Sequence, residues 1–387
     1  MHILELPSFF PPYGGLFCLD QAKALKALGH EVRILSNVQL GATIGLRDYI
    51  VRPYRRFEHV MDGVTVCQSY QRGLPRMVRY NVNRWVSIVS SMFDDYVRKY
   101  GKPDVIHAHC AKWAGYAAML INRKYHLPYI ITEHLAYYDY VGEFGVPPSN
   151  SWQIPLLKES LKQASCVIPV SEEVVSQLSG FFGNDYHWKS IPNMIDTDFL
   201  GFCQRAPLQG RPFRFCCLGL FVDRKGYDVL FRAFKCVQMQ YPDAELHIAG
   251  RATGSDRCRR LLSSLGIKQG VTIHGELDKW GVRDLLYLSD ALVLATRGET
   301  QGLVLLEAMS TGIPAISTEA IPASVRPKEG CVFVPVDDAD ALADAMTGAI
   351  TSPPTDGRVL SEIARQMASP EAIANQIALV LEHSLCQ

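Results

Sequence analysis

The sequence predicts an α/β protein built from two similar halves. Its length of 387 residues favours two domains over one. In each half, short apolar runs alternate with segments of helix-forming residues, which is the pattern of parallel sheets covered by helices. Residues 200–212 contain two glycines and two prolines without periodicity, as linkers do. We therefore expect Rossmann-like domains over residues 1–205 and 206–368, facing across a cleft, and a C-terminal helix over residues 369–387.

The first half opens with a strand at residues 3–6, a helix at residues 16–28 and a second strand within residues 29–35. The loop before the helix contains Gly14 and Gly15, which let a ligand approach the backbone closely, although a tight turn alone would also use them. The loop lacks the G-x-G-x-x-G fingerprint of dinucleotide-binding domains, which argues against an NAD enzyme. Later elements of this half are a helix at residues 152–163, a strand at residues 166–170 and a helix to residue 178 with Ser171 as its N-terminal cap.

Arginines are concentrated between residues 47 and 84, a segment that contains eight arginines and only three acidic residues. The later arginines accompany an apolar stripe with helical spacing, formed by Leu74, Met77, Val78, Trp85, Val89 and Phe93. A basic amphipathic helix of this kind can lie on an anionic membrane or hold a phosphorylated acceptor. A solvated helix packed on the core is the alternative. The candidates for an acceptor or membrane surface are Arg72, Arg76, Arg79 and Arg84.

Two histidines end the strand at residues 104–109. Alternation along an extended chain places His107 and His109 on one face, and His134 ends the next expected strand. A metal site is conceivable, but the short ligand spacing and the H-E-x-x-H motif of zinc sites are both missing. We therefore favour polar contacts to a sugar, or a neutral base, over metal binding.

The second half repeats the alternation. We expect strands at residues 213–218, 246–249, 271–274 and 291–294. The loop at residues 219–226 leads into a helix that ends at residue 237, and two further helices are expected at residues 303–309 and 370–385. The strand, loop and helix of residues 291–309 are the most informative part. Gly302 begins the helix, whose N-terminus offers free N–H groups to a phosphate or diphosphate. Glu299 and Glu307 flank this point and can accept hydroxyl donors, which suits an activated sugar. Solvated helix charges are the alternative, but the apolar neighbours of Glu307 argue against it.

The composition excludes several classes of protein. Lysine plus arginine and aspartate plus glutamate both number 39, so no overall charge recruits nucleic acid. The 11 cysteines are scattered without a C-x-x-C pair, as expected for reduced thiols. No apolar run reaches the length of a membrane span, and the N-terminus lacks the pattern of a signal peptide. We expect a soluble, cytoplasmic protein.

Short motifs along nearly the whole chain match those of one family in their order and spacing. They are residues 12–15 (PYGG), 29–32 (GHEV), 104–109 (DVIHAH), 170–172 (VSE), 191–196 (IPNMID), 225–226 (KG) and the E-x7-E pair Glu299/Glu307. The chain thus resembles the retaining GT-B glycosyltransferases of family 4, also called glycosyl transferases group 1. In that family, the C-terminal helix crosses back onto the N-terminal domain.

The resemblance implies roles for particular residues. Gly14 and Gly15 would line the diphosphate of a nucleotide-sugar donor, and His109 would contact the transferred sugar. Lys225 would neutralise the diphosphate and help the nucleotide leave.

On the same resemblance, Glu299 would orient the hydroxyls of the donor sugar and would join His109 and Lys225 as the catalytic residues. The backbone N–H groups of Gly302, Leu303 and Val304 would bind the diphosphate. Glu307 would hold the ribose.

The chain departs from the family pattern at several positions. Leu220 stands where the family often has arginine, so Arg224 would have to supply that charge. Gln301 replaces the usual aromatic residue before the loop glycine, and Thr296 and Arg297 replace a Pro-Ser pair. These departures bear on the identity of the donor more than on the reaction.

The family resemblance also implies a mechanism and partners. Transfer would retain the anomeric configuration by front-face displacement, with no cofactor and no bound metal because fixed positive charge replaces it. The donor would be a sugar on UDP or GDP. The acceptor would be a glycan or a polyprenyl-diphosphate-linked sugar, as in bacterial capsule, exopolysaccharide or lipopolysaccharide synthesis, with the enzyme in the cytoplasm or peripheral to the inner face of the cytoplasmic membrane.

Three other functions are compatible with parts of the sequence. A sugar-nucleotide-binding protein without turnover is suggested by Leu220 but opposed by the intact Lys225, Glu299 and Glu307. A nucleotide-sugar epimerase of the same fold would use the same donor site. An NAD oxidoreductase is opposed by the missing fingerprint.

Overall fold

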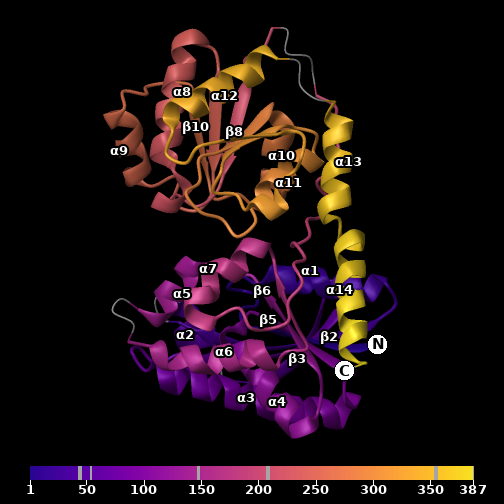
Figure 1. Ribbon diagram of the computed structural model, residues 1–387. Coiled ribbons are helices and arrows are strands. Elements are labelled where there is room, and N and C mark those ends of the chain that lie inside the picture. The colour runs from indigo at the N-terminus through magenta and orange to yellow at the C-terminus, as the bar shows by residue number, and fades with distance from the viewer. Residues whose placement is uncertain (42–45, 53–54, 146–148, 206–209, 353–355, 387) are drawn as a thin grey trace. The chain divides into compact units, whose positions relative to one another are not determined.

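The computed structural model describes residues 1–387 except 42–45, 53–54, 146–148, 206–209, 353–355 and 387. The chain forms two compact units (Figure 1). Unit 1 comprises residues 1–194 together with residues 370–387, and unit 2 comprises residues 195–369. Each unit is an α/β domain with its own sheet, as the sequence predicts, and each is described by itself below.

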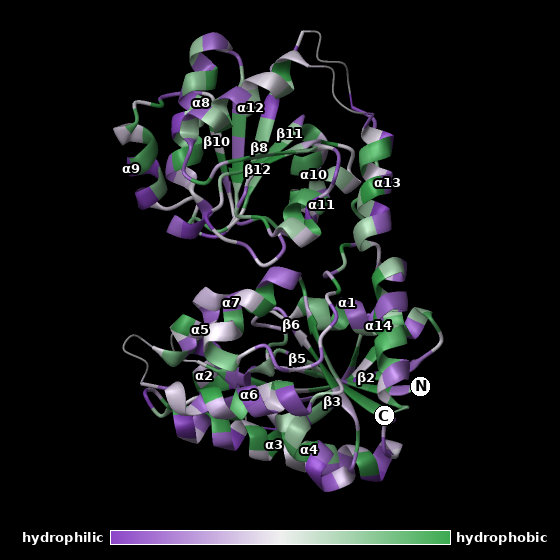
Figure 2. Ribbon diagram, viewed as in Figure 1, coloured by the Kyte–Doolittle hydropathy of each residue, from purple (hydrophilic) through white to green (hydrophobic). Residues whose placement is uncertain are grey.

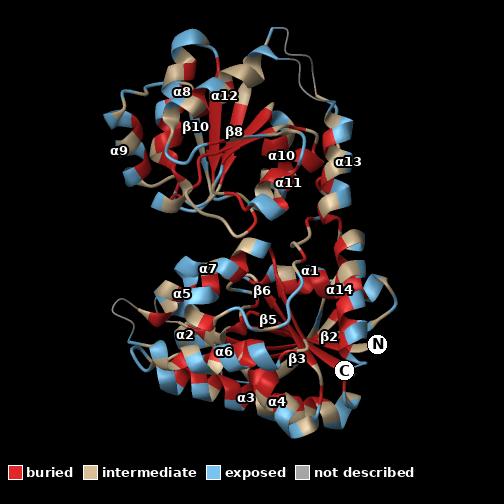
Figure 3. Cartoon of the chain, in the orientation of Figure 1, coloured by how far each residue is buried: buried red, intermediate tan, exposed pale blue. Residues whose placement is uncertain are grey.

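Unit 1 contains a seven-stranded sheet in the order β3-β4-β2-β1-β5-β6-β7. The strands are β1 (His2–Pro7), β2 (Glu31–Leu40), β3 (Arg56–Met61), β4 (Val64–Arg72), β5 (Val105–His109), β6 (Tyr129–Glu133) and β7 (Cys166–Pro169). All neighbours pair in parallel except β3, which forms an antiparallel edge with β4. Figure 3 shows that the central strands are buried, and Figure 2 shows their apolar character. The C-terminal ends of β1, β5 and β6 therefore lie next to one another at one edge of the sheet.

Helices cover both faces of this sheet. They are α1 (Leu16–Ala27), α2 (Leu46–Val51), α3 (Val78–Tyr100), α4 (Tyr116–Tyr125), α5 (Tyr137–Phe144), α6 (Ile154–Gln163), α7 (Glu172–Phe182) and α14 (Pro370–Ser384), with short turns η1 (Ala111–Gly115) and η2 (Ser151–Gln153). On one face, Trp85 and Phe93 of α3 pack against Leu4 and Ile106. On the other face, α1 and α14 cover a cluster that contains Ile3. The C-terminal helix thus returns to the N-terminal domain, as the family resemblance implies.

Unit 2 contains a six-stranded parallel sheet in the order β10-β9-β8-β11-β12-β13. The strands are β8 (Arg214–Leu218), β9 (Glu245–Ala249), β10 (Val271–Gly275), β11 (Ala291–Leu294), β12 (Ala315–Thr318) and β13 (Cys331–Val334). The helices are α8 (Tyr227–Gln240), α9 (Asp256–Ser264), α10 (Lys279–Leu288), α11 (Leu303–Ser310), α12 (Ala339–Thr351) and α13 (Gly357–Ala368), with short turns η3 (Asp223–Lys225) and η4 (Ala323–Val325). Strands β8 and β11 are neighbours in this sheet, so the loops that follow them meet.

Residues 195–205, which include the first part of the expected linker, belong structurally to unit 2. Ile195 packs with Leu306 and Met309 of α11. Arg205 donates hydrogen bonds to the carbonyl oxygens of Ser289 and Thr311, which follow the ends of α10 and α11. A cation at helix C-termini is favourable because carbonyl groups there lack partners within the helix. The compact units therefore divide between residues 194 and 195, whereas we expected a boundary at residues 205 and 206; residues 206–209 of the expected linker lie outside the described residues.

Two local expectations need correction. Ser171 is the N-cap residue of α7, as expected, but its hydroxyl is buried and makes no side-chain capping hydrogen bond. The helix expected to carry the apolar stripe begins only at Val78, so Leu74 and Met77 precede it. Met77 is 48% exposed, in contrast to the buried Trp85.

Candidate functional site

The loop between β11 and α11 is shaped to leave a helix N-terminus open. Gly302 precedes the helix with φ 81°, in the left-handed region, and a Cβ atom there would lie 2.6 Å from Cδ1 of Ile321. Only glycine therefore fits without displacing Ile321. The N–H groups of the first helical turn, which include those of Leu303 and Val304, have no carbonyl partner within the helix. This is the local geometry of an anion-binding site.

Lys225 and Glu299 form an ion pair beside this helix end. Lys225 lies in η3, after β8, and its ammonium group contacts Oε1 of Glu299. Both side chains are largely buried, with exposed fractions of 16% and 9%. Gly226, the next residue, has φ 63°, and a Cβ atom there would lie 1.8 Å from the carbonyl oxygen of Ala295. The loop after β8 and the loop after β11 can therefore approach this closely only because residue 226 is glycine. Their approach brings Lys225 into contact with Glu299.

Further hydrogen bonds hold the two loops together. The N–H of Arg297 donates to the carbonyl of Arg224 at 2.7 Å. The Arg297 guanidinium pairs with Asp228 at 2.9 Å and with Asp337 at 2.6 Å. Arg297 therefore supports the loop that carries Glu299, a role the sequence analysis missed; the signal available was an arginine at a position where the family has a small residue.

Arg224 itself remains close to the site. Its Nη1 donates to the carbonyl of Gly298 at 3.3 Å, within the loop that carries Glu299. Leu220 is 41% exposed and offers no charge. The position of Arg224 is thus compatible with the substitute charge that the sequence analysis expected.

Glu307 lies in the second turn of α11 and is partly buried. Within the described part of the chain, its carboxylate has no recorded hydrogen bond or ion pair. Burial without a compensating partner raises its pKa to about 7. An unpartnered carboxylate in such a place is ready to accept hydrogen bonds from a bound hydroxyl.

In unit 1, the loop after β1 contains the two predicted glycines. Gly15 has φ 78°, and a Cβ atom there would lie 1.9 Å from the carbonyl oxygen of Phe9, so the turn requires glycine. Gly14 has φ 100°, and no atom lies within 4 Å of the position a Cβ would take. Gly15 thus serves the turn, whereas Gly14 leaves open space beside the backbone.

The predicted histidines converge on a carboxylate that the sequence analysis did not single out. Glu5 of β1 pairs in register with His107 of β5. Its Oε2 lies 3.1 Å from Nδ1 of His107 and 2.6 Å from Nε2 of His109. The outer nitrogen of His107 contacts Oγ1 of Thr132 at 2.7 Å, and Nδ1 of His109 contacts Nε2 of His134 at 3.2 Å. A glutamate in an otherwise apolar strand was the available signal.

The electrostatics of this cluster favour an ionised Glu5 and neutral forms of His109 and His134. Burial alone would raise the pKa of Glu5, but the charge and hydrogen bonds of His107 and His109 lower it to about 2. Burial lowers the pKa of His109, and it lowers that of His134 further below its usual range. His109 is fully buried with both ring nitrogens occupied, so its expected contact with a sugar would require a rearrangement.

Glu5, His107 and His109 are also the one group of described residues whose donor atoms lie close enough together, within 4.8 Å, to suggest a metal site. Two histidines and a carboxylate are a known donor set for divalent metals. Here the atoms that could bind a metal are hydrogen-bonded to one another instead. All four ring nitrogens of His107 and His109 already have a hydrogen-bond partner. We therefore do not assign these residues as metal ligands.

A pocket of about 410 Å³ lies in unit 1 near these strand ends. It is lined by the aromatic residues Phe9, Phe10, Tyr13 and Trp113, by the polar or charged residues Ser8, Gln39, Asn81, Lys112, Glu143 and Asn150, and by Val38, Val78 and Gly142. Lys112 pairs with Glu143 at 2.5 Å, so the lining carries no net charge. Trp113 has φ 63° and ψ −57°, and its indole N–H is buried without a recorded partner. Such backbone strain is typical of functional sites.

The four arginines expected on an acceptor or membrane surface differ in their surroundings. Arg72 donates to the carbonyls of Tyr49, Ile50 and Arg52, so its guanidinium supports the α2 region. Arg76 and Arg79 are exposed, the latter over the ring of Trp152, whereas Arg84 is partly buried and already has an interaction. Exposed apolar residues lie in α2, among them Ile50 and Val51 at 64% and 68%. The exposed arginines and the apolar residues of α2 are compatible with an acceptor or membrane surface and also with a solvated helix packed on the core.

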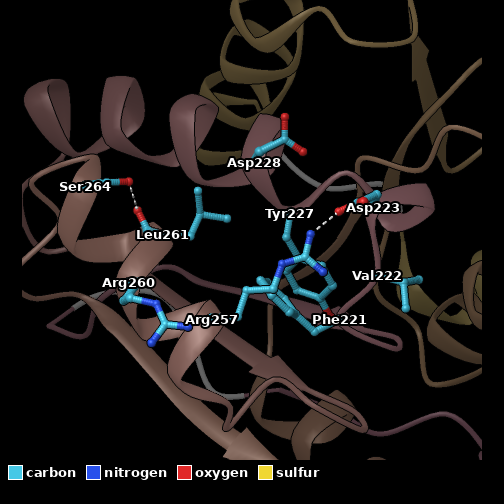
Figure 4. A pocket seen from close by; sticks show the side chains of 9 residues that line it. All are labelled: Phe221, Val222, Asp223, Tyr227, Asp228, Arg257, Arg260, Leu261 and Ser264. Carbon is cyan, nitrogen blue, oxygen red and sulfur yellow. Dashed lines mark hydrogen bonds and ion pairs between the residues drawn. The ribbon is translucent and has the colours of Figure 1, made fainter.

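A further pocket of about 400 Å³ lies in unit 2 between the loop after β8 and helices α8 and α9 (Figure 4). Figure 4 shows the Arg257 guanidinium paired with Asp223. None of the predicted site residues lines this pocket. We assign it no part in the site.

Comparisons with known proteins agree with this architecture. Residues 14–199 match the family model described as Glycosyltransferase Family 4, and residues 212–352 match the model described as Glycosyl transferases group 1. The Bacillus subtilis protein TuaC, named as a teichuronic acid biosynthesis glycosyltransferase, is 24% identical over 373 residues, which cover 90% of this chain and 88% of TuaC.

Solved structures resemble the chain along its whole length. Sucrose-phosphate synthase from Thermosynechococcus elongatus has a TM-score of 0.78 at 21% identity and covers 100% of both chains. Anabaena HepE in complex with UDP-glucose has a TM-score of 0.68 at 18% identity, covering 99% of this chain and 100% of HepE. These likenesses show a shared fold, that of GT-B enzymes.

Proposed function

Because the chain belongs to the family 4, group 1 glycosyltransferases, we propose that it transfers a sugar from a nucleotide-diphosphate donor to a hydroxyl group of a glycan or lipid-linked acceptor. The observation that carries the proposal is the Lys225–Glu299 pair beside the open N-terminus of α11. A diphosphate needs positive charge and N–H donors, and the donor sugar needs a carboxylate for its hydroxyls. These groups occur together here.

Each residue then has a defined part. The diphosphate receives hydrogen bonds from the N–H groups of Gly302, Leu303 and Val304 and charge from Lys225, with Arg224 close by. Glu299 accepts from the sugar hydroxyls, and Glu307 accepts from the ribose. Binding of hydroxyl donors favours the ionised form of Glu307, whose pKa is raised by burial.

The reaction proposed is front-face displacement with retention at the anomeric carbon. The bond from the anomeric carbon to the diphosphate oxygen breaks, the acceptor oxygen forms the new bond on the same face, and the departing diphosphate takes the acceptor's proton. The positive groups at the α11 end stabilise the charge that develops on the leaving diphosphate. The residues named supply this charge themselves, so the proposal includes no metal and no cofactor.

We propose that the acceptor binds to unit 1. Aromatic walls and polar groups without net charge suit a neutral sugar ring, which supports the uncharged part of a glycan as the group bound in the pocket around Trp113. TuaC is named for teichuronic acid biosynthesis, and we propose a role for this chain in bacterial cell-surface polysaccharide synthesis. UDP is the first donor nucleotide to test because HepE was solved with UDP-glucose, and GDP is the second.

Membrane association is a separate part of the proposal. None of the helices that the structure describes combines the length and the hydropathy of a membrane span. The exposed apolar residues of α2, together with the exposed Arg76 and Arg79, would suit peripheral binding to an anionic inner membrane surface. Co-sedimentation with vesicles containing anionic lipid, compared with neutral vesicles, tests this part.

The test of the donor site is a thermal-shift screen of UDP, GDP, ADP and CMP and their sugars. A ligand that binds only the folded protein raises the melting temperature. We expect one nucleotide to stabilise the wild type and to lose most of this effect in Glu307→Ala, while Glu362→Ala, an exposed helix glutamate, serves as the control. If no nucleotide or nucleotide sugar binds, the donor-site proposal fails. If one binds, NMR of the product gives the anomeric configuration, and an inverted linkage would contradict front-face displacement.

A further inference from the structure

The pocket around Trp113 contains one cation and one anion, and the two are paired with each other. Its volume of about 410 Å³ is in the range of small-molecule sites. Lys112 and Glu143 are the two charged groups among the described residues that line it, and they form an ion pair at 2.5 Å. Both side chains are largely buried, with exposed fractions of 13% and 16%. All of these lining residues belong to unit 1. A ligand in this pocket therefore meets a cation that the protein has already neutralised.

The cation of the pair is held against the aromatic wall of the pocket. The backbone around Lys112 is fixed by the loop after β1, because the Ser8 hydroxyl donates to the Lys112 carbonyl oxygen and accepts from the N–H of Ala114 at 3.2 Å. The Lys112 ammonium group lies over the rings of Phe9 and Trp113, at 5.3 and 5.0 Å from their centroids. A cation over the face of an aromatic ring is favourable. The positive charge therefore has a fixed place in the wall.

The anion of the pair comes from α5 and is also held in place. Oε2 of Glu143 pairs with Lys112, and Oε1 accepts a hydrogen bond from Nε2 of Gln153 at 3.3 Å. Asn150, another lining residue, donates from Nδ2 to the carbonyl oxygen of Glu143 at 3.2 Å. An anionic ligand at Lys112 would either displace this anchored carboxylate or lie beside it. Both are unfavourable, since like charges repel at close range.

We propose that Glu143 determines the specificity of this pocket: by neutralising Lys112, it restricts the pocket to uncharged sugars and excludes sugars that carry a carboxylate or phosphate. The proposal rests on the proposed function for the identity of the ligand as a sugar. Aromatic walls can pack against the apolar face of an uncharged ring without disturbing the ion pair. Without Glu143, the pocket would contain a largely buried, unpaired cation, which an anion stabilises. Loss of this one carboxylate should therefore reverse the preference.

Titration with simple sugars tests the proposal without a donor and without turnover. The probes are the methyl glycosides of glucose, galactose and mannose, each compared with the matching uronic acid glycoside, in which a carboxylate replaces the CH2OH group. Binding is followed by ¹H–¹⁵N NMR at the indole N–H signal of Trp113, assigned with Trp113→Phe. In the wild type, we expect a neutral glycoside to shift this signal and its uronic acid counterpart to bind about tenfold more weakly.

Glu143→Gln removes the negative charge and keeps the size of the side chain. We expect its affinity for the uronic acid glycoside to rise about tenfold, with the affinity for the neutral glycoside changed by less than about threefold. The gain should disappear when Lys112→Met is added, because no cation then remains in the wall. Asp185→Asn, which removes the partner of the exposed Lys162, is the matched control and should change neither affinity. A Glu143→Gln variant without this gain would overturn the proposal.

Lys112→Met alone is the second variant, in case Glu143→Gln does not fold. Methionine keeps an unbranched, polarizable side chain against the rings of Phe9 and Trp113 and leaves Glu143 without its cation. The expected change is the mirror image of the first. A glycoside with an ammonium group in place of that carboxylate should gain about tenfold in affinity, while the uronic acid glycoside stays excluded. An unchanged order of affinities in Lys112→Met would contradict control by the ion pair.

Failure of this proposal is distinguishable from failure of the proposed function. If nucleotides bind in the thermal-shift screen but uronic acid glycosides bind to the wild type as tightly as neutral ones, the specificity proposal is wrong and the donor site stands. If no glycoside shifts the Trp113 signal, the pocket is not a sugar site, and the proposal is overturned whatever the nucleotides do. If no nucleotide binds but the glycosides follow the expected order, the transferase proposal fails and the pocket remains a site for uncharged sugars.

Discussion

Two glutamates, one in each unit, are placed in apolar surroundings and respond in opposite ways. Glu5 in unit 1 is fully buried and receives hydrogen bonds from two histidines, so its pKa falls to about 2. Glu307 in unit 2 is partly buried and has no recorded partner among the described residues, so its pKa rises to about 7. The protein supplies hydrogen-bond donors to the first carboxylate, and we propose that a ligand supplies them to the second. Glu299, paired with Lys225, lies between these cases.

The largest effect expected from this contrast is on stability. Glu5→Met leaves two buried N–H groups without their acceptor, and we expect a loss of about 3–5 kcal/mol in the free energy of unfolding. Glu307→Met removes an unpartnered carboxylate and should leave stability at neutral pH unchanged or increased. Scanning calorimetry of both variants checks this pair. Equal losses in the two variants would show that the two glutamates do not differ in the way described.

The intermediate case is tested by turnover. Lys225→Met removes the positive charge proposed for the leaving diphosphate and the partner of Glu299. We expect about 10²–10³-fold lower turnover of the donor found in the nucleotide screen, with the fold retained. Lys235→Met, an exposed lysine on α8, is the matched control. Turnover within twofold of the wild type would exclude Lys225 from the reaction.

The pKa values predict opposite pH dependences of stability. The pKa of Glu307 is raised from 4.5 to about 7, so the folded protein holds more protons than the unfolded chain between these values, and stability falls as pH rises through that range. Ionisation of Glu307 should lower the free energy of unfolding by about 1–2 kcal/mol, after allowance for the partial exposure of its side chain. The pKa of Glu5 is lowered from 4.5 to about 2, so its contribution is present above pH 4.5 and is lost as pH falls toward 2.

These pH effects are measured as differences between variants. The melting temperature of Glu307→Gln relative to the wild type should increase from pH 5 to pH 7.5, because the variant lacks the destabilising carboxylate. Glu362→Gln should show no such trend. A constant difference across this range would mean that the pKa of Glu307 is not raised in the folded protein.

The smallest effect expected concerns the shape of the helix N-terminus. Gly302→Ala places a Cβ atom against Ile321 at a left-handed position, and we expect a loss of about 1–2 kcal/mol in stability and weaker diphosphate binding. Gly348→Ala, at a helical glycine with open space around it, should be neutral or stabilising. If Gly302→Ala binds nucleotide as the wild type does, the open helix end is not the diphosphate site.

Much of the architecture follows from the sequence alone. Residues 291–294 and 303–309 were expected as strand and helix, and the structure has β11 at Ala291–Leu294 and α11 at Leu303–Ser310. Such elements are predictable because apolar runs, glycines and prolines act locally. Lys225 and Glu299 are 74 residues apart in the sequence, and a family motif placed both at the donor site. In the structure, the pairing of β8 with β11 brings them together.

The remaining features depend on contacts that no local pattern encodes. Glu5 looked like one polar residue in a short strand, and its partners lie 102 and 104 residues away on a neighbouring strand. Arg297 looked like a departure from a motif, yet it binds aspartates from two other segments. The sequence by itself determined the α/β elements and the glycines at their loops, because these follow from local propensity and spacing, whereas most candidate site residues were implied by the family resemblance. The tertiary structure decided which carboxylate is satisfied and which is left open, because a carboxylate's pKa depends on the groups that folding places around it.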